Sequence, residues 1–264
     1  MELNLAGRAA AVMASSDGLG RAIATALARE GASVAICGRD ADRLAAAKGE
    51  IEASATQDAG VVGEVLDVGH ADAPGRLVAA AVGAFGGLDI LVTNAGGPPA
   101  GPLLSFDDDA WQSAFDLTLR SVARACRAAQ PHLAASGQGR IVCIASSSVA
   151  AALSGLGFSN VFRPGIHGLV KTLAEELGPQ GITVNLVAPG KIATGRVAML
   201  DAKRGASSGR SAEEIRSQVE GEIPLGRYGE PAELAEVVTF LCSQAARYVS
   251  GTATLVDGGY VRAL

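Results

Sequence analysis

One stretch near the N-terminus combines small, polar and glycine residues in a way that suits phosphate binding. A short apolar run over 9–13 leads into a turn, and a helical pattern opens at Leu19. Backbone N–H groups at the start of a helix attract anions, and glycine lets the backbone approach a pyrophosphate closely. The sequence therefore predicts a dinucleotide phosphate site in this turn, whose residues are Ala14, Ser15, Ser16, Asp17, Gly18, Leu19 and Gly20.

Strand-like and helix-like segments alternate along the rest of the chain. Apolar runs predict strands over 9–13, 33–37, 61–66, 88–93, 140–145, 183–187 and 252–256. Between them lie helical patterns, among them 71–85, 165–177 and 231–242, whereas 191–230 is expected to be irregular with one helix near 213–220. This alternation implies right-handed crossovers and a parallel sheet covered on both faces. We predict a single α/β domain over residues 1–264, built as a doubly wound parallel sheet.

Ligands of such sheets bind beyond the C-terminal ends of the strands, where the strand order reverses. The turns after the first, second, fourth and fifth predicted strands fall on that edge. They carry the phosphate turn, the Gly38-Arg39-Asp40 turn and the glycine-rich run over 94–97. The candidate site is therefore expected along this edge.

Composition narrows the class of protein. Hydrophobic residues make up 48% of the 264 residues, which supports a large core, and the net charge of −5 argues against nucleic acid or an anionic membrane as a main partner. No apolar run is long enough for a membrane span, and no export signal is visible. The four cysteines and three histidines are scattered, which favours reduced thiols and no metal site in a cytoplasmic protein.

At this point the chain resembles the short-chain dehydrogenase/reductase family, in particular its 3-oxoacyl-carrier-protein-reductase-like members. The matching segments occur in the right order over essentially the whole chain: Gly18-Leu19-Gly20, Asp67-Val68, Asn94-Ala95-Gly96, Arg140-Ile141-Val142, Val184-Asn185 with Pro189-Gly190, Ile223-Pro224-Leu225-Gly226-Arg227 and Val256-Asp257-Gly258-Gly259. The resemblance implies a Rossmann fold, a nicotinamide cofactor, hydride transfer and a homotetramer, with a homodimer as the alternative. It also assigns cofactor contacts to Asp67, Val68, Asn94, Ala95, Gly96, Pro189, Gly190 and Ile192.

The family's catalytic Asn, Ser, Tyr and Lys are not all present. Alignment by the same resemblance places Thr118, Ser146, Ser159 and Arg163 at these four positions, so that only the serine is retained. Serine is a far poorer acid than tyrosine, and arginine stays protonated, so neither relays a proton as the family's pair does. Arg163 and Ser146 are still expected to stabilise a negatively charged oxygen.

The helix that carries these positions also contains a second pair with the family's spacing, His167 and Lys171, and a proline, Pro164. His167 and Lys171 have the spacing of the family's Tyr and Lys, but they lie eight residues further along, about 12 Å at 1.5 Å per residue. We reject them as replacements because that places them away from the nicotinamide end. Pro164 lacks a backbone N–H, so we expect the helix to begin or kink there.

The cofactor preference depends on residues around the first two turns. Arg39 stands where members that prefer NADP carry a basic residue for the 2′-phosphate, and Gly38 stands where an NAD-binding acid is expected. Asp17 argues in the other direction, because many NADP-dependent relatives have a basic residue there. Ala14 replaces the first glycine of the family's turn and adds a methyl group near the pyrophosphate. The plainer alternative makes Arg39 a solvated loop residue and Asp17 a helix N-cap. We predict NADP(H) over NAD(H).

The segment over 191–230 is expected to form a lid over the substrate, as it does in the family. Its first half carries Lys191, Arg196, Lys203, Arg204 and Arg210 against the single Asp201. A basic lid would favour an anionic substrate, although a solvated flexible loop explains the same charges.

Three functions remain open at the level of the sequence. The favoured one is an NADP(H)-dependent oxidoreductase acting on a carbonyl or hydroxyl substrate, which the resemblance suggests is 3-oxoacyl-like. The second is an enzyme of this fold with non-redox chemistry, such as a cyclase, dehydratase or isomerase. The third is a non-catalytic cofactor-binding protein. A small-molecule substrate is expected in the first two.

Overall fold

Seven parallel strands form one sheet in the order β3-β2-β1-β4-β5-β6-β7. The structure is a computed structural model that describes residues 2–262. The strands are β1 (Ala9–Val12), β2 (Ser33–Gly38), β3 (Val61–Val65), β4 (Ile90–Thr93), β5 (Arg140–Ile144), β6 (Thr183–Pro189) and β7 (Ala253–Val256). The chain runs outward from β1 to β3 and then returns to β4, so the order reverses between β1 and β4.

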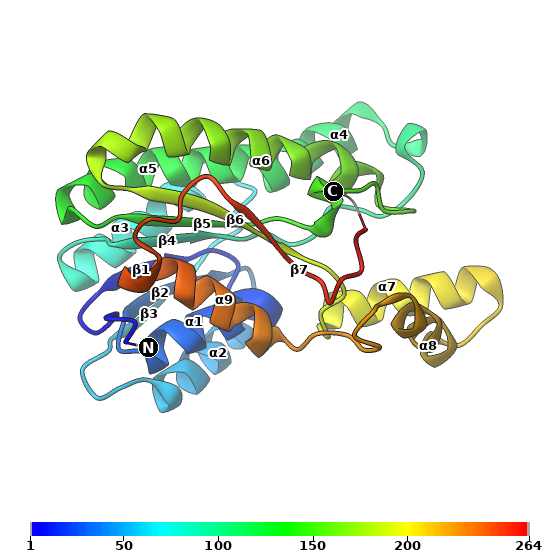
Figure 1. Ribbon diagram of the computed structural model, residues 1–264, viewed down its shortest axis with the longest axis horizontal. Helices are drawn as coiled ribbons and strands as arrows, with labels where there is room; N and C mark the ends of the chain where they lie inside the picture. The colour runs from blue at the N-terminus through cyan, green and yellow to red at the C-terminus, as the bar shows by residue number, and fades with distance from the viewer. Residues whose placement is uncertain (1, 263–264) are drawn as a thin grey trace.

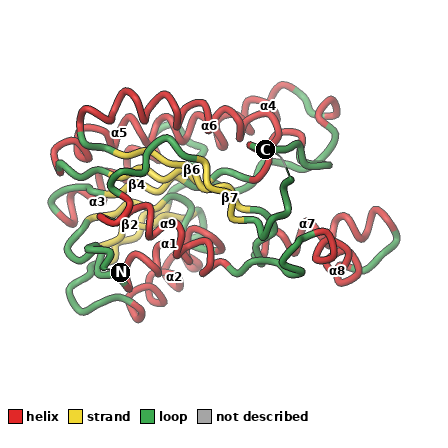
Figure 2. The backbone as a smooth tube through the Cα atoms, viewed as in Figure 1, coloured by secondary structure: helices red, strands yellow, loops and turns green. Residues whose placement is uncertain are grey.

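Helices cover both faces of the sheet (Figures 1 and 2). One face carries α1 (Gly18–Arg29), α2 (Ala41–Ser54) and α9 (Pro231–Cys242). The other carries α3 (Ala73–Phe85), α5 (Ser121–Ser136) and α6 (Gly157–Leu177). The remaining helices are α4 (Asp108–Phe115), next to α6, and the pair α7 (Gly195–Ser208) and α8 (Ala212–Glu222), which stands apart from the sheet. The predicted single-domain, doubly wound parallel sheet is confirmed.

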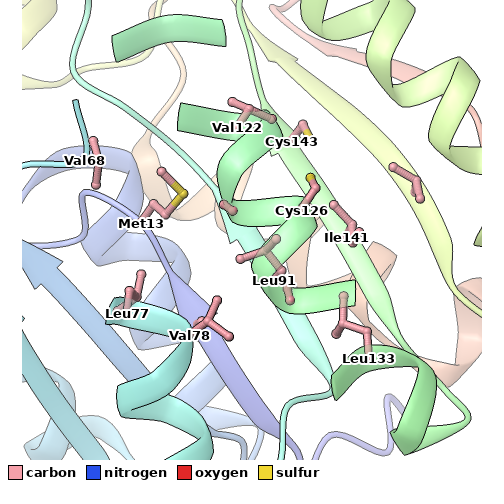
Figure 3. Close-up of a cluster of buried hydrophobic side chains, with 14 of the residues drawn as sticks. Met13, Val68, Leu77, Val78, Leu91, Val122, Cys126, Leu133, Ile141 and Cys143 are labelled. Carbon is pink, nitrogen blue, oxygen red and sulfur yellow. The ribbon is translucent and has the colours of Figure 1, made fainter. Parts of the chain in front are cut away.

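The central strands are apolar throughout because both of their faces are buried. Side chains alternate along β1, where Ala11 belongs to the core under α3, α5 and α6, and Ala10 and Val12 belong to the core under α1, α2 and α9. Figure 3 shows part of the first of these cores, where Met13, Leu91 and Cys126 lie among aliphatic side chains. All four cysteines are buried and unpaired, as the sequence predicts.

The first helix is specified by its ends and by its apolar stripe. Asp17, in extended conformation, caps its N-terminus and accepts a hydrogen bond from the N–H of Gly18. Ile23 and Leu27 are four residues apart and fully buried, which turns this stripe toward the sheet and toward α9. Gly31 follows with a φ of 88°, a left-handed conformation that glycine adopts without strain.

Two predictions about helices are wrong. The helix expected over 165–177 with a boundary at Pro164 begins at Gly157 and contains Pro164 in its interior. Phe158 and Phe162, four residues apart, pack against Trp111 of α4, and this contact holds the first turns in place. Residues 191–230 contain α8, which corresponds to the helix predicted near 213–220, but also α7, where an irregular segment was expected.

Across residues 2–262, every helix is too short or too polar to cross a lipid bilayer.

Candidate functional site

The turn over 14–20, which follows β1, has the tight backbone expected of a phosphate-binding turn, and we call it the cradle. Ala14 has a φ of 47° and Gly18 a φ of 53°, both in the left-handed region. A Cβ atom at position 20 would overlap the carbonyl oxygen of Ala14, so this position requires glycine. Ser15 is fully buried and ties the turn to its neighbours: its hydroxyl donates to the carbonyl of Val12 over 2.7 Å and accepts from the N–H of Cys37 over 3.0 Å.

The end of β2 lies directly beside this cradle. A Cβ atom at Gly38 would overlap the hydroxyl of Ser16, so a larger residue there requires Ser16 to move. The side chain of Arg39 is 79% exposed, and its one ion pair among the described residues joins Nη1 to Oδ2 of Asp67 over 3.7 Å. An exposed pair at that distance contributes little to stability and leaves Arg39 available to an anionic ligand.

The turns after β3 and β4 lie at the same C-terminal edge of the sheet as the cradle. Asp67 accepts a hydrogen bond from the N–H of Gly69, and Val68 is buried in the core. Asn94 donates from Nδ2 to the carbonyl of Ala14 over 3.1 Å, which joins the β4 turn to the phosphate turn. Ala95 is half-buried, and Gly96 is exposed at the start of the loop that follows.

The segment after β6 places Thr194 beside the cradle, a contact that the sequence analysis missed. The side-chain methyl of Thr194 lies 3.7 Å from where a Cβ atom of Gly18 would stand, and its hydroxyl caps the N-terminus of α7. Gly190 packs so closely on Asp257 that a Cβ atom there would overlap that side chain, and Ile192 is buried. The only sequence signal at Thr194 is its hydroxyl, which is typical of a helix N-cap. That signal predicts the start of a helix and does not place the residue beside the turn over 14–20.

The four positions aligned with the catalytic tetrad lie near the C-terminal ends of β4 and β5. Ser146 follows β5 and its hydroxyl accepts from the N–H of Ser148 over 3.2 Å. Ser159 is half-buried on α6, one helical turn before Arg163. Thr118 is fully buried at the centre of a π-helical turn, Asp116–Arg120, and its hydroxyl has no partner within residues 2–262. Such turns recur at functional sites.

Arg163 is the most unusual of these residues. Its side chain is buried, and Nη1 donates to the carbonyl of Ile144 over 2.9 Å. Burial lowers the pKa of its guanidinium to about 10, and no charged neighbour contributes to that shift. We regard the group as protonated at neutral pH, because arginine holds its proton even where burial disfavours the charge.

An aromatic cluster supports the other side of α6. The rings of Phe106 and Phe158 stack with centroids 4.4 Å apart, and Trp111 meets Phe158 edge-on at 5.1 Å. Phe162 and Phe115 complete the cluster. These rings fix the rotation of α6 about its axis and hence the positions of Ser159 and Arg163.

His167 and Lys171 lie where the sequence analysis placed them, further along α6. The ammonium of Lys171 is 4.0 Å from where a Cβ atom of Gly251 would stand, just before β7 begins. Because β7 is parallel to its neighbours, that position is at the N-terminal edge of the sheet, opposite the candidate site.

A cavity of about 520 Å³ lies between the loops after β4 and β5, and its lining contains none of the four tetrad positions. Its walls come from the loop after β4, including Gly101 and Leu103, and from the loop after β5, including Leu153. A backbone hydrogen bond from Gly101 to Gly155 joins the two loops. Asn160, next to Ser159, also lines the cavity and exchanges two hydrogen bonds with the backbone of Leu153. A larger groove of about 650 Å³ runs along α1 and α9, and its lining contains none of the four tetrad positions.

The α7–α8 pair is attached to the loop after β4 by two basic side chains. Arg196 donates to the carbonyl of Pro98 over 2.7 Å, and Lys203 donates to the carbonyl of Ala100 over 3.0 Å. Asp201 is buried and accepts a hydrogen bond from the hydroxyl of Tyr228 over 3.0 Å. Burial, more than any charge, lowers the pKa of Lys191.

These features, a tight glycine-containing turn after β1 and a doubly wound parallel sheet, are those of dinucleotide-binding α/β proteins. Residues 13–261 match the family model described as enoyl-(acyl carrier protein) reductase. The chain belongs to the short-chain dehydrogenase/reductase family, and it is an oxidoreductase of the type that includes 3-oxoacyl-carrier-protein reductases.

Individual relatives are similar over nearly the whole chain. Dehydrogenase/reductase SDR family member 4 of Oryctolagus cuniculus is 37% identical over 259 residues, which cover 97% of this chain and 94% of the relative. The 3-oxoacyl-(acyl-carrier-protein) reductase of Staphylococcus aureus is 33% identical over 255 residues, covering 96% and 97%. The structure of L-sorbose reductase from Gluconobacter frateurii, complexed with NADPH and L-sorbose, superimposes with a TM-score of 0.94 at 31% identity and covers 100% of both chains.

Proposed function

We propose that the protein is an NADP(H)-dependent oxidoreductase that interconverts a carbonyl and a hydroxyl group on a small-molecule substrate. The observation that carries this proposal is the cradle after β1, where position 20 admits only glycine and Asn94 holds the carbonyl of Ala14. Two relatives that match along the whole chain are named as reductases, and the L-sorbose reductase structure contains NADPH. We place the enzyme in the cytoplasm. The 3-oxoacyl group suggested by the resemblance is one carbonyl of the proposed kind.

The residues present fit a dinucleotide. The 14–20 turn and Thr194 would hold the pyrophosphate, and Arg39 would bind a 2′-phosphate. Asp67, Val68, Asn94, Ala95 and Gly96, with Pro189, Gly190 and Ile192 beyond β6, remain the expected further contacts along the cofactor. Asp17 acts as a helix N-cap in the structure, so its presence does not require NAD. When bound, the reduced nicotinamide supplies a hydride to the carbonyl carbon.

The protein's own side chains then act on the carbonyl oxygen. The hydroxyls of Ser146 and Ser159 donate hydrogen bonds to it, and Arg163 supplies a fixed positive charge as the oxygen becomes an alkoxide. Thr118 adds a further hydroxyl at the same edge. Because serine is a weak acid, water or the substrate provides the proton that neutralises the alkoxide.

A titration of the purified protein with NADPH and with NADH tests this proposal. We expect NADPH to bind at least ~10-fold more tightly, and Arg39→Ala to lose most of that difference while leaving NADH affinity unchanged. Arg29→Ala, which removes an exposed arginine at the far end of α1, is the control and should leave both affinities unchanged. Failure of both nucleotides to bind would exclude the redox function.

The altered tetrad also favours a second candidate, an enzyme of the same fold with non-redox chemistry. It predicts product formation without any change in nicotinamide absorbance. A cofactor-binding protein without catalysis would bind NADPH and turn over no carbonyl compound.

A further inference from the structure

Arg196 stands in the first turn of α7, beside the segment that follows β4. A Cβ atom at Gly97 would stand 2.9 Å from Nε, 3.0 Å from Nη2 and 3.1 Å from Cζ of Arg196. Because these three distances are nearly equal, the plane of the guanidinium lies flat against the backbone of Gly97. Nη2 also donates to the carbonyl of Pro98 over 2.7 Å. Arg196 therefore contacts two consecutive residues of this segment.

The side chain of Arg196 forms no ion pair with a carboxylate among residues 2–262. It is half-buried, and burial lowers the pKa of its guanidinium without any contribution from a charged neighbour. A hydrogen bond donated by a charged group is roughly twice as strong as one between neutral groups. The bond to Pro98, which is itself buried, is therefore the main polar contact that fixes this side chain.

This contact closes a ring around the proposed nucleotide site. Two residues before Arg196, the methyl group of Thr194 lies beside Gly18 of the cradle. In the segment after β4, Asn94 donates to the carbonyl of Ala14, at the start of the cradle, over 3.1 Å. The cradle, the start of α7 and the segment after β4 thus form a closed ring of contacts, and most of the residues expected to hold the nucleotide lie along it.

The contact made by Arg196 is the member of this ring that opens most easily. Asn94 directly follows β4 and Ala14 lies just after β1, and these strands are neighbours in the centre of the sheet, so their bond joins parts of one rigid layer. The α7–α8 pair, in contrast, stands apart from the sheet (Figure 1). Only Asp201 and Gly205 of α7 are buried. A segment with few buried contacts opens locally at a low cost in free energy.

We propose that Arg196 is a positioning residue that closes the proposed nucleotide site, and that breaking its contact with Gly97 and Pro98 admits and releases NADP(H). This inference rests on the proposed function and specifies how its cofactor is exchanged. While the ring is closed, the nucleotide neither enters nor leaves. When α7 moves away from the segment after β4, both become possible. Binding and release are therefore limited by the same opening.

Stopped-flow fluorescence of NADPH measures both rates without any turnover, with excess NADP⁺ as the chase for release. Arg196→Met keeps the apolar part of the side chain and removes the donor to Pro98. We expect the association and dissociation rate constants each to rise ~10-fold, the lower end of what a hydrogen bond from a charged group contributes. The Kd should change by less than about threefold, because both rate constants change together. Arg196→Lys keeps a charged donor without the planar fork and should raise both rate constants only about threefold.

Gly97→Ala tests the same contact from its other side. Its methyl group would overlap the guanidinium of Arg196 and displace it, whereas the φ of Gly97 lies outside the left-handed region, so alanine fits the backbone. It should raise both rate constants as Arg196→Met does, and the double variant should be no faster than either single one. Lys203→Met is the control, because Lys203 joins the same helix to Ala100 through an exposed side chain and contributes little. It should leave both rate constants unchanged.

The kinetic pattern distinguishes control of nucleotide exchange from a purely structural role. If Arg196 only shaped the site around the bound nucleotide, its loss would raise the dissociation rate constant alone and weaken the Kd by the same factor. That pattern, unchanged rate constants in Arg196→Met, or an equal acceleration in Lys203→Met would overturn this inference and leave the proposed function intact. Failure of the unmodified protein to bind NADPH would refute the proposed function itself, and this inference with it.

Discussion

At the scale of single residues, the proposed site combines residues expected to hold the cofactor with an altered set of groups for handling the proton. In this proposal Thr118, Ser146, Ser159 and Arg163 supply hydroxyls and a fixed charge, and the position expected for the family's tyrosine is a serine. A tyrosine with a pKa near 10 is a much better proton donor than a serine hydroxyl. The missing acid, rather than the binding of the substrate, is therefore expected to limit turnover.

Restoring the family's residues tests this reasoning. The triple variant Thr118→Asn, Ser159→Tyr, Arg163→Lys should raise kcat for a neutral ketone by about 10²- to 10⁴-fold, the usual contribution of general-acid catalysis. Steady-state rates with NADPH provide the measurement. The same triple variant with phenylalanine at 159 has the bulk without the hydroxyl and should gain nothing. Equal rates in the two variants would show that the proton is not limiting.

The strained Ala14 offers a second prediction at this scale. With a φ of 47°, an L-residue costs about 1–2 kcal/mol, and glycine removes this strain while adding about 0.4–1 kcal/mol of unfolded-state entropy. Ala14→Gly should therefore stabilise the protein by about 0.5 kcal/mol, which raises the melting temperature by ~1–2 °C. Gly18→Ala, with a φ of 53° in the same turn, should change stability in the opposite sense. A lower melting temperature for Ala14→Gly would contradict this account.

At the scale of elements, the strands could be predicted because of their burial. β1, β4, β5 and β6 are covered on both faces, so their sequences are mostly apolar, with Arg140 in β5 and Asn185 in β6 as buried polar exceptions, and they are easily distinguished from their surroundings. The phosphate turn could also be predicted, because its small, polar and glycine residues interrupt the apolar run of β1. The position of Thr194 beside it could not be predicted, because that contact joins residues 176 apart in the sequence.

Of the helices after β6, α7 was not predicted and α8 was predicted slightly too short, because both bury little. Among the residues of α7 only Asp201 and Gly205 are buried, and in α8 only Ile215 and Val219, too few for an apolar period. Their ends are nevertheless marked: Ser211 and Glu214 form a reciprocal capping box. At α6, Pro164 predicts a helix boundary, but the aromatic pair Phe158 and Phe162 stabilises a helix that continues across it.

An exposed ion pair where α8 leads into α9 gives a pH-dependent prediction. Arg227 donates twice to Glu233, over 2.7 and 2.6 Å, and these bonds lower the pKa of Glu233 from 4.5 to about 2. A depressed carboxyl pKa stabilises the folded state above pH 4.5, and this stabilisation is lost as the pH falls toward 2. The protection factors of amides in α8 and at the start of α9, relative to intrinsic exchange at each pH, should therefore fall more on acidification to pH 3 than they do in Glu233→Gln. An equal loss of protection in both proteins would exclude the ion pair as the cause.

At the scale of the whole molecule, the β7 edge of the sheet and its surroundings carry exposed apolar side chains. β7 ends the sheet on one side with Leu255 36% exposed, and nearby Leu225 is 67% exposed. A sheet edge with apolar side chains readily pairs with another chain. This is compatible with the homotetramer that the resemblance implies, or with a homodimer.

Sedimentation velocity tests the assembly. We expect a mass four times that of the chain, and Leu255→Glu should lower the average mass at micromolar concentration because it places a charge at the β7 edge. Val65→Glu alters an exposed apolar residue on β3, the opposite edge strand, and should leave the mass unchanged. A monomer at all concentrations would exclude both oligomers, and a mass unaffected by Leu255→Glu would exclude the β7 edge as an interface.

The packing of α1 against α9 also determines when the protein can mature during its synthesis. The helix that follows the phosphate turn is translated early, but the side of it that faces α9 is covered only by residues 231–242, more than 200 positions later. At about 5–20 residues per second, a ribosome needs roughly 10–40 s to make that interval. The nascent chain is therefore expected to wait with an uncovered apolar helix, and to acquire its nucleotide only once the polypeptide is nearly complete.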